Sequence, residues 1–277
     1  MGKVPVLIND NQSLFRREDF VALRNTAFDP PRPRFRQWLD KVLPSLGKNF
    51  KAEENYKLLA RLLLARSPEP VVLVVGGRVL GEGMEALISR PEIRLVETDV
   101  ALGPRTQAIC DARDLPFEDS SFDGVVIQAV LQYVPDPARC VQEVERVLKP
   151  DGLVYAETAF MQQVVHGRYD FTRFTHVGVR GLFRRFRELR SGPVAGPAMA
   201  LAWAYHFFLL SFATRRLTRR LIHAVVRLTL FWVKYLDVLL LDKPGIYDSA
   251  SGFFFLGTRQ NWSLTDREVV RSYRGAQ

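Results

Sequence analysis

Short continuous runs of hydrophobic residues alternate with amphipathic segments from residue 71 onward. The run VVLVV at 71–75 contains only apolar residues, which is typical of a parallel strand covered on both faces. Before it, the segment 55–66 has apolar residues at helical spacing and predicts a helix. A shorter apolar run at 4–8 predicts one strand near the N-terminus.

Four more strands and a helix follow from the same pattern. The strands are expected at residues 93–98, 107–110, 122–128 and 152–158, and the helix at 138–148. Strands separated by helices indicate an α/β doubly wound sheet, which binds ligands at the carboxyl ends of its strands. Only about eight residues separate the second strand from the third, fewer than a parallel crossover usually needs. We therefore expect the helix at that crossover to be lost or reduced to one turn.

Between residues 193 and 244 the pattern becomes much more apolar. The stretch 192–214 has no charged residue, but its prolines and glycines leave about 16 residues suited to a helix, fewer than the roughly 20 that span a bilayer. If the following stretch is helical, its basic side chains form one stripe beside a wide apolar arc; they are Arg216, Arg220, His223, Arg227 and Lys234. Such an arc needs a cover. Three are open: the preceding helix, a second subunit, or a membrane interface with the basic stripe toward acidic head groups.

The chain has 277 residues, enough for one full domain, and a net charge of +9. The positive charge favours anionic partners, although a general preference for arginine would explain it as well. The two cysteines, Cys110 and Cys140, lack the spacing of a zinc site or a disulfide framework, so we expect no metal and a reducing compartment. The N-terminal residues do not match a signal peptide. These features predict a cytoplasmic protein, with the inner face of the membrane as the alternative location.

Three motifs narrow the chemistry. The glycine-rich segment GGRVLGEG follows the strand at 71–75, DARDLPFEDSSFD spans residues 111–123, and RVLKPDG spans residues 146–152. Taken together in this order, they resemble the class I S-adenosylmethionine-dependent methyltransferases, in particular a broad bacterial group with an LPF…SFD loop and an RVLKPGG turn. The resemblance covers roughly residues 71–186.

The resemblance implies a doubly wound, Rossmann-like α/β sheet of seven strands. Strands six and seven would lie at 186–192 and 251–259, the last one antiparallel beside the fifth. The implied domain organisation is an N-terminal extension at 1–67, a methyltransferase domain at 68–262 with an apolar helical insertion at 193–244, and a C-terminal tail at 263–277.

The cofactor of the family is S-adenosylmethionine, and the resemblance implies how this chain would hold it. Glycines after the first strand let the main chain approach the cofactor closely, because no Cβ intervenes. An acid after the second strand, Asp99 with Glu97 as its close competitor, would accept from the ribose hydroxyls. An Asp–Ala pair after the third strand would meet the adenine, and a polar residue after the fourth would meet the methionine end. The implied cofactor-binding residues are Gly76, Gly77, Gly81, Asp99, Asp111, Ala112 and Gln128.

The same region departs from the family in three places. Val74 stands where most members have an acid, and Arg78 replaces the second closely spaced glycine. Tyr133 stands where relatives often have a histidine, so a base at that position is absent. From the residues alone, each glycine could also serve a plain turn, and each acid could cap a turn or be solvated.

Candidate catalytic residues lie in the segment 161–186, after the fifth strand. Similar bacterial methyltransferases carry an H…YDF.RFT pattern there, which this chain matches with His166, Asp170 and Arg173. Methyl transfer depends mostly on positioning, and an oxygen acceptor also benefits from a base such as histidine. We favour His166 over His176 as that base, with Asp170 or Arg173 orienting it or holding the substrate. The alternative is a structural ion pair between Asp170 and Arg173 that anchors the loop.

We therefore expect S-adenosylmethionine-dependent methyl transfer to a small-molecule, sugar or lipid-linked glycan acceptor, with a membrane surface or a second copy of the chain as a partner through 193–244. The main alternative is a binding or scaffold protein without turnover, which Val74 and Arg78 favour. Nucleic-acid methylation is less well supported, because no basic groove with interleaved aromatic residues is evident. A dinucleotide-dependent dehydrogenase is disfavoured, because its only matching glycine motif, at 81–86, begins five residues too late.

Overall fold

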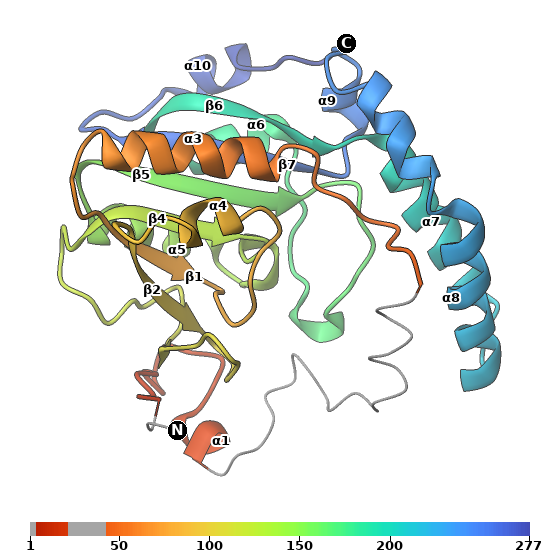
Figure 1. Cartoon of the computed structure of the whole chain (residues 1–277), viewed down its shortest axis with the longest axis horizontal. Helices are drawn as coiled ribbons and strands as arrows, with labels where there is room; N and C mark the ends of the chain where they lie inside the picture. The colour runs from red at the N-terminus through yellow and green to blue at the C-terminus, as the bar shows by residue number, and fades with distance from the viewer. Residues whose placement is uncertain (1–3, 22–42) are drawn as a thin grey trace.

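The computed structural model of the chain describes residues 4–21 and 43–277. Residues 1–3 and 22–42 of the expected N-terminal extension lie outside the described residues. Within the described part, a seven-stranded sheet forms the centre and helices cover both of its faces (Figure 1).

The sheet confirms the expected doubly wound, Rossmann-like α/β fold. Its strands are β1 (Val71–Val75), β2 (Arg94–Asp99), β3 (Ala108–Ile109), β4 (Phe122–Gln128), β5 (Leu148–Ala159), β6 (Phe186–Ala195) and β7 (Gly252–Arg259), in the order β3-β2-β1-β4-β5-β7-β6. As expected, β7 runs antiparallel to its neighbours β5 and β6, while the other neighbouring strands are parallel. The direction of strand order reverses between β1 and β4, and ligands bind at such a point, beyond the carboxyl ends of the strands.

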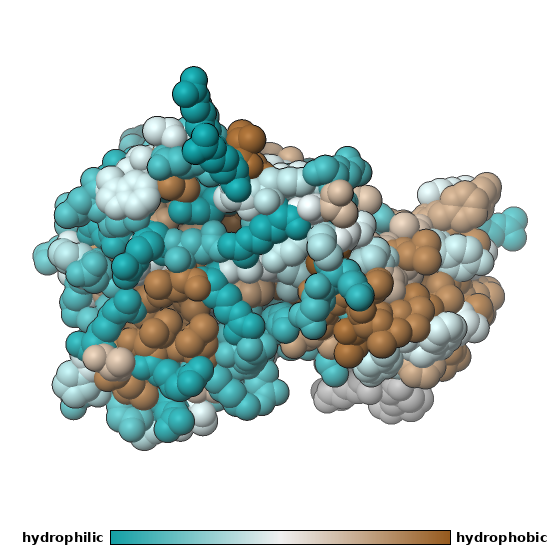
Figure 2. All heavy atoms as spheres, turned by 90° about the horizontal axis from the view of Figure 1, so that it is seen from above, coloured by the Kyte–Doolittle hydropathy of each residue, from teal (hydrophilic) through white to brown (hydrophobic). Residues whose placement is uncertain are grey.

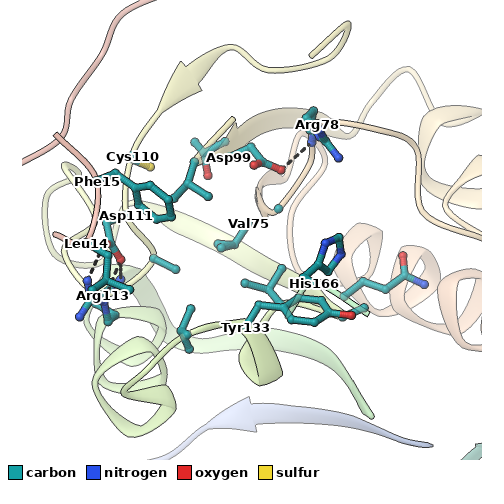
Figure 3. A pocket seen from close by; sticks show the side chains of 18 of the residues that line it. Leu14, Phe15, Val75, Arg78, Asp99, Cys110, Asp111, Arg113, Tyr133 and His166 are labelled. Carbon is teal, nitrogen blue, oxygen red and sulfur yellow. Dashed lines mark hydrogen bonds and ion pairs between the residues drawn. The ribbon is translucent and has the colours of Figure 1, made fainter. Parts of the chain in front are cut away.

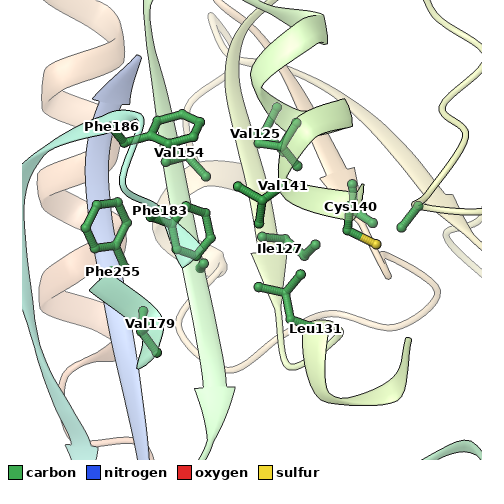
Figure 4. Close-up of a cluster of buried hydrophobic side chains, with 14 of the residues drawn as sticks. Val125, Ile127, Leu131, Cys140, Val141, Val154, Val179, Phe183, Phe186 and Phe255 are labelled. Carbon is green, nitrogen blue, oxygen red and sulfur yellow. The ribbon is translucent and has the colours of Figure 1, made fainter. Parts of the chain in front are cut away.

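Alternation along the strands sends side chains into two hydrophobic cores. Val72 and Val74 pack on the face covered by α3 (Ala52–Leu64) and α4 (Glu85–Ile88). Leu73 and Val75 pack on the opposite face, in the core that α5 (Pro137–Val147) and α6 (His176–Leu182) cover (Figure 4). A strand buried on both faces needs apolar residues at every position, which explains the uninterrupted VVLVV run.

Side-chain caps define where α5 and α6 begin. Asp136 accepts a hydrogen bond from the backbone N–H of Arg139 (3.0 Å), and Pro137 occupies the first helical position. Thr175 accepts a hydrogen bond from the backbone N–H of Gly178 (3.0 Å). Each cap pairs an N–H that the helix itself leaves unsatisfied, so both helices begin at a defined residue.

Three local expectations meet different outcomes. The expected strand at 4–8 is wrong, since within it only Val6 makes a bridge, a parallel one to Ile109 at the sheet edge. β5 begins at Leu148 rather than at residue 152, and an irregular register places Asp151 at a φ of +59° inside it. The expected loss of the crossover helix between β2 and β3 is confirmed, and β3 itself is short.

The insertion forms a helical hairpin at one end of the molecule (Figure 1). It contains α7 (Pro197–Ser211) and α8 (Arg216–Leu230), followed by the 3-10 helix η3 (Val233–Leu239) and the short α9 (Ile246–Ser249). The two long helices meet through His206 and His223, whose rings lie edge to face with centroids 4.6 Å apart. Among the described residues, no helix combines the length and the apolar character that crossing a bilayer requires.

The expected single helix with one basic stripe needs correction. The α-helix ends at Leu230, so Lys234 and Asp237 belong to η3. Arg227 and Lys234 donate hydrogen bonds to main-chain carbonyls of residues 43–45. Buried Asp237 accepts from two backbone N–H groups in the first turn of α7 (2.8 and 3.1 Å), which pairs groups the helix cannot pair itself. These charges therefore face the protein, and the apolar arc faces outward.

Shorter elements complete the described chain at both ends. Helix α1 (Arg17–Val21) precedes the first gap, and η1 (Leu131–Tyr133) and η2 (Gly167–Tyr169) lie in the loops after β4 and β5. The segment expected as a tail contains α10 (Asp266–Arg271), which begins at a capping box and contacts α6. The C-terminal residues are therefore part of the packed domain.

Candidate cofactor-binding and active site

A cavity of about 230 Å³ opens at the carboxyl ends of β1 to β4, at the point where the strand order reverses (Figure 3). Six of the residues predicted from the sequence line it: Gly76, Asp99, Asp111, Ala112, Gln128 and His166. Four others do not line it: Gly77, Gly81, Asp170 and Arg173. The sheet therefore brings most of the expected cofactor residues to one place, whereas their roles stay predictions.

The turn after β1 requires glycine at Gly76. This residue has a φ of +80°, a conformation that side chains with a Cβ rarely adopt. A Cβ added there would lie 2.3 Å from Cγ2 of Val130, which follows β4. The backbone N–H groups of Gly76 and Gly77 both donate to the carbonyl of Thr98 (2.8 and 2.9 Å), which ties the turn to β2. The main chain at Gly76 therefore borders the cavity with no side chain between.

Gly81 serves packing rather than the cavity wall. A Cβ at Gly81 would lie 1.7 Å from Oε1 of Gln128. That oxygen accepts from the hydroxyl of Tyr56 (3.1 Å), while the Gln128 amide donates to Glu157 (2.9 Å) and to the carbonyl of Glu82 (3.2 Å). The side-chain amide of Gln128 is thus held by protein groups, although the residue lines the cavity.

The end of β2 distinguishes the two acids between which the sequence left a choice. Asp99 lines the cavity and accepts from the backbone N–H groups of Arg78 (3.2 Å) and Ala101 (2.9 Å). Burial raises the pKa of its carboxyl, against the lowering effect of these hydrogen bonds. Glu97 does not line the cavity and forms an ion pair with Arg105 (2.8 Å). Residues two apart on a strand point to the same face, so alternation alone does not separate Glu97 from Asp99. They differ because Asp99 is the last residue of β2, where the cavity opens.

Asp111 lies in the cavity wall but is already engaged by its neighbours. Its carboxylate accepts from the guanidinium (3.1 and 2.8 Å) and backbone N–H (3.0 Å) of Arg113, and from the hydroxyl of Ser13 (2.7 Å). Burial alone would raise the pKa of Asp111, but these hydrogen bonds hold it below its usual value. A ligand that hydrogen-bonds to this carboxylate would have to share it with Arg113 and Ser13.

The N-terminal segment contributes residues that the sequence did not indicate. Leu14 and Phe15 line the cavity on the side of Asp111, and the ring of Phe15 stacks on Tyr169 with centroids 5.9 Å apart (Figure 3). The only sequence signal in this region was the apolar run at 4–8. The cavity is slightly smaller than the roughly 300–1,000 Å³ of typical small-molecule sites, so these covering residues would need to move outward for a large ligand.

His166 and Tyr133 form the opposite wall of the cavity (Figure 3). Their rings lie edge to face with centroids 4.5 Å apart, so a histidine from the loop after β5 reaches the position next to Tyr133. Burial raises the pKa of the Tyr133 hydroxyl, which therefore stays protonated at neutral pH. His176 instead lies in the core against Ser191 (3.0 Å), where burial lowers its pKa to about 4.

Asp170 and Arg173 form an ion pair away from the cavity. Arg173 also donates to the carbonyls of Gln162 and Gln163 (2.9 Å each), and Asp170 accepts from the backbone N–H of Val165 (2.8 Å). The pair therefore cross-links the loop on which His166 lies. This geometry favours the structural alternative for both residues, as groups that position the loop.

Two kinds of chemistry are disfavoured by what surrounds the cavity. Cys110 lines it, but burial raises the pKa of its thiol to about 12, so a thiolate nucleophile is not available at neutral pH. In the part of the chain that the structure describes, no cluster of histidine, cysteine or acidic side chains could hold a metal ion.

Comparison with known proteins agrees with this geometry. Residues 88–156, from the helix after the glycine turn to β5, match the model of a methyltransferase domain. This match covers about a quarter of the chain and supports a class I methyltransferase family. The matched residues include β2, β3 and β4, whose carboxyl ends line the cavity, and exclude the insertion.

Curated relatives match only part of this chain. Demethylmenaquinone methyltransferase from Staphylococcus aureus strain MRSA252 is 54% identical over 125 residues, which is 42% of this chain and 47% of that protein. The protein of the same name from strain JH9 is 54% identical over 44 residues, 16% of this chain and 18% of that protein. The chain therefore spans about half or less of the length of these relatives.

Solved structures resemble this chain more distantly. The S-adenosyl-L-methionine complex of phosphoethanolamine N-methyltransferase 2 from Haemonchus contortus is 16% identical, with a TM-score of 0.45 over 83% of this chain and 61% of that one. The MccD protein is 10% identical, with a TM-score of 0.47 over 75% and 97% of the two chains. At scores below 0.5, we draw no conclusion from them.

Proposed function

We propose that this protein transfers a methyl group from S-adenosylmethionine to a small-molecule acceptor. The observation that carries the proposal is a single cavity at the strand-order reversal. It joins the main chain of Gly76, the carboxylate of Asp99, the Asp111–Ala112 turn and, on its far side, His166. A methyltransferase needs these two regions, one for the cofactor and one for the acceptor, to share one space.

The residues present fit an adenosyl group. At Gly76 the cavity wall is bare main chain, which a Cβ would obstruct. Asp99 places in the cavity a carboxylate that accepts hydrogen bonds from the backbone N–H groups of Arg78 and Ala101. Asp99 would accept from the ribose hydroxyls, and the backbone N–H of Ala112 would face the adenine. When bound, S-adenosylmethionine supplies an electrophilic methyl group on a sulfonium.

His166 is the group that we assign to the acceptor side. It lies on the cavity wall opposite Asp111 and can accept a proton from an acceptor hydroxyl as the methyl group is transferred. The protonated Tyr133 beside it can donate a hydrogen bond to the same acceptor. Asp170 and Arg173 act through the loop, by holding His166 at the cavity. Catalysis would rest mainly on this positioning.

The acceptor is proposed as a small molecule, either free or carried on a lipid. The names of the curated relatives refer to demethylmenaquinone, which supports a small-molecule acceptor without identifying it. A sugar or a lipid-linked glycan would also present the hydroxyl that a histidine base serves. A nucleic-acid acceptor has no comparable support.

A scaffold protein without turnover is the second candidate, because several expected cofactor groups are occupied or replaced. Val74 is buried where the family carries an acid, and Arg113 and Ser13 engage the carboxylate of Asp111. The Gln128 amide is likewise held by protein groups. If these contacts persist in solution, the cavity would bind the cofactor weakly or not at all.

Titration calorimetry with S-adenosylhomocysteine separates the two candidates. We expect a Kd below about 100 μM for the wild type, which corresponds to roughly −5.5 kcal/mol. Asp99→Asn should weaken binding by about 10- to 100-fold, because a hydrogen bond to a charged group contributes roughly 1.5–3 kcal/mol. Asp119→Asn, at an exposed acid in a surface ion pair, is the matched control and should bind normally. Absence of binding at millimolar ligand would leave only the scaffold.

A further inference from the structure

The insertion exposes large apolar side chains that neither the core nor the cavity uses. Of the 28 large hydrophobic residues that are exposed in the described part of the chain, 14 lie between residues 201 and 239. This short segment therefore holds half of the exposed apolar side chains. Figure 2 shows them as hydrophobic surface over the end of the molecule that projects with α7 and α8.

The exposed residues form a stripe on each helix. On α7 they recur at intervals of four, three and four residues, which places them within an arc of about 60° at 100° per residue. On α8 the intervals are four, four and three residues, and the arc is about 80°. The exposed residues are Leu201, Tyr205, Phe208 and Phe212 from α7 and its C-terminus, and Leu217, Leu221, Val225 and Leu228 on α8. Phe212 and Leu217, near the tip of the hairpin, are 72% and 67% exposed. Residues that repeat in this way on a helix surface need a partner.

Aromatic residues flank the stripes near the base of the hairpin. Trp232 and Tyr235 are about half exposed, and the ring of Tyr235 lies near the ammonium group of Lys48. Tryptophan and tyrosine are enriched where a protein meets the boundary between water and lipid, because their rings have both apolar and polar parts. Their position beside the exposed apolar stripes matches such a boundary.

The charge of residues 193–236, which include the α7–α8 hairpin, has a single sign. Between residues 193 and 236 the chain has six arginine and lysine residues and no aspartate or glutamate. Two of these cations, Arg227 and Lys234, bind main-chain carbonyls of residues 43–45. The other four are exposed around the tip of the hairpin: Arg215, Arg216, Arg219 and Arg220. The apolar tip therefore lies within a group of positive charges.

This charge distinguishes lipid from a second copy of the chain as the partner. In a two-fold dimer the same patch meets itself, so the four arginines of one copy would face a patch that carries four more arginines and no acid to pair with them. Anionic head groups would instead attract the arginines while the apolar side chains enter the acyl boundary. We propose that the α7–α8 hairpin docks this protein on the surface of an anionic lipid bilayer.

The position of the hairpin in the sheet relates docking to the cavity. The insertion leaves from the end of β6 and returns to the start of β7, where Gly252 pairs with Ala195 and with Ala159 at the end of β5. Because β5 is parallel to β4, this is the sheet edge at which the cavity opens. The docked hairpin would thus bring that edge toward the bilayer. Resting on the proposed function, this favours an acceptor carried in the membrane over one free in solution.

Flotation of the full chain with vesicles tests the docking. Vesicles of phosphatidylcholine alone are compared with vesicles that contain 30 mol% (about one third) phosphatidylglycerol, at low and at high salt. We expect the protein to float with the anionic vesicles, and the bound fraction to fall with salt. Leu217→Ser/Leu221→Ser should lower the partition coefficient at least tenfold. Arg216→Gln/Arg220→Gln should abolish the preference for anionic vesicles.

Matched controls lie on the opposite end of the fold. Trp262→Ser/Val270→Ser removes two equally exposed apolar side chains, and Arg267→Gln/Arg271→Gln removes two exposed arginines at the same spacing on α10. Both should float like the wild type. The proposal is overturned if the wild type stays with the unbound fraction, or if the controls lose flotation as much as the hairpin variants do. It is also overturned if sedimentation shows a dimer that dissociates only in the Leu217→Ser/Leu221→Ser variant. S-adenosylhomocysteine binding is measured separately, so failure of docking and failure of the proposed function give different results.

Discussion

The wall of the cavity at Gly76 offers the sharpest test of how the site is built. A Cβ at this position would lie 2.3 Å from Cγ2 of Val130, but 3.8 Å from its Cβ, which is an ordinary contact. Gly76→Ala therefore introduces two separate problems, a backbone conformation at φ +80° and a clash with one methyl group. Val130→Ala removes that methyl group and leaves the backbone problem.

The two contributions have different expected sizes. Holding an alanine in a left-handed conformation costs about 1–2 kcal/mol, partly offset by about 0.4–1 kcal/mol from its stiffer unfolded chain. Forcing an extra methyl group into a packed site costs typically 1–3 kcal/mol. We therefore expect Gly76→Ala to lower the free energy of unfolding by about 2–4 kcal/mol. In the Gly76→Ala/Val130→Ala double variant, the loss beyond that of Val130→Ala alone should shrink to about 1 kcal/mol.

Urea unfolding of the four proteins in this cycle gives the coupling directly. Gly167→Ala is the matched control, because Gly167 has a φ of +57° and nothing lies within 4 Å of an added Cβ. It should lose only about 1 kcal/mol, the backbone contribution alone. The affinity for S-adenosylhomocysteine is measured in parallel and should follow the same order. If Gly76→Ala is no less stable than Gly167→Ala, or if Val130→Ala rescues nothing, then the close approach of Gly76 to Val130 does not govern this wall.

Three further predictions concern the core and the loop. His176 has a pKa of about 4 in the fold against its usual 6.5, so between these values the unfolded chain binds more protons than the folded one. The free energy of unfolding should therefore fall as the pH decreases, by at most about 1.4 kcal/mol per pH unit. His176→Gln should flatten that slope in urea unfolding measured from pH 7 to 4. Phe255→Ala should cost about 3–5 kcal/mol of unfolding free energy, because the buried ring stacks on a second phenylalanine, while exposed Phe171→Ala should change it by less than about 0.5 kcal/mol. Asp170→Asn should speed hydrogen exchange in the loop 162–170 and leave S-adenosylhomocysteine affinity unchanged; equal exchange would contradict a positioning role.

The sequence was a good guide to the elements and a poorer one to the insertion. Hydrophobic runs and periodicity are local properties, so the strands from β1 to β7 could be placed to within a few residues. The prediction of a strand at 4–8 was wrong because an apolar run does not show how many residues of a neighbouring strand it can pair with. Here only Val6 forms a bridge, to Ile109. The helical wheel failed beyond Leu230 because the chain leaves the α-helix there, where Asp237 turns back to cap α7.

The candidate site divides in the same way. That Gly76, Asp99 and Asp111 would meet followed from the sequence, because consecutive parallel strands end at one edge of a sheet. The resemblance favoured Asp99 over Glu97 at the end of β2, and Asp99 is the one that lines the cavity. The partners of the two acids could not be read from the sequence: Arg105 pairs with Glu97, and backbone N–H groups donate to Asp99. The cover provided by Phe15 was likewise not foreseen, because nearly a hundred residues separate it in sequence from the wall that it contacts.

The sequence by itself therefore determined the order and type of the secondary structure and the edge of the sheet at which the cavity opens. These depend on periodicity and on residues close together in the chain. Only the tertiary structure decided which polar groups are already engaged, which segment covers the cavity, and which side of the insertion faces outward. Those outcomes depend on hydrogen bonds and packing between residues far apart in the chain, for which a single sequence has no local signal.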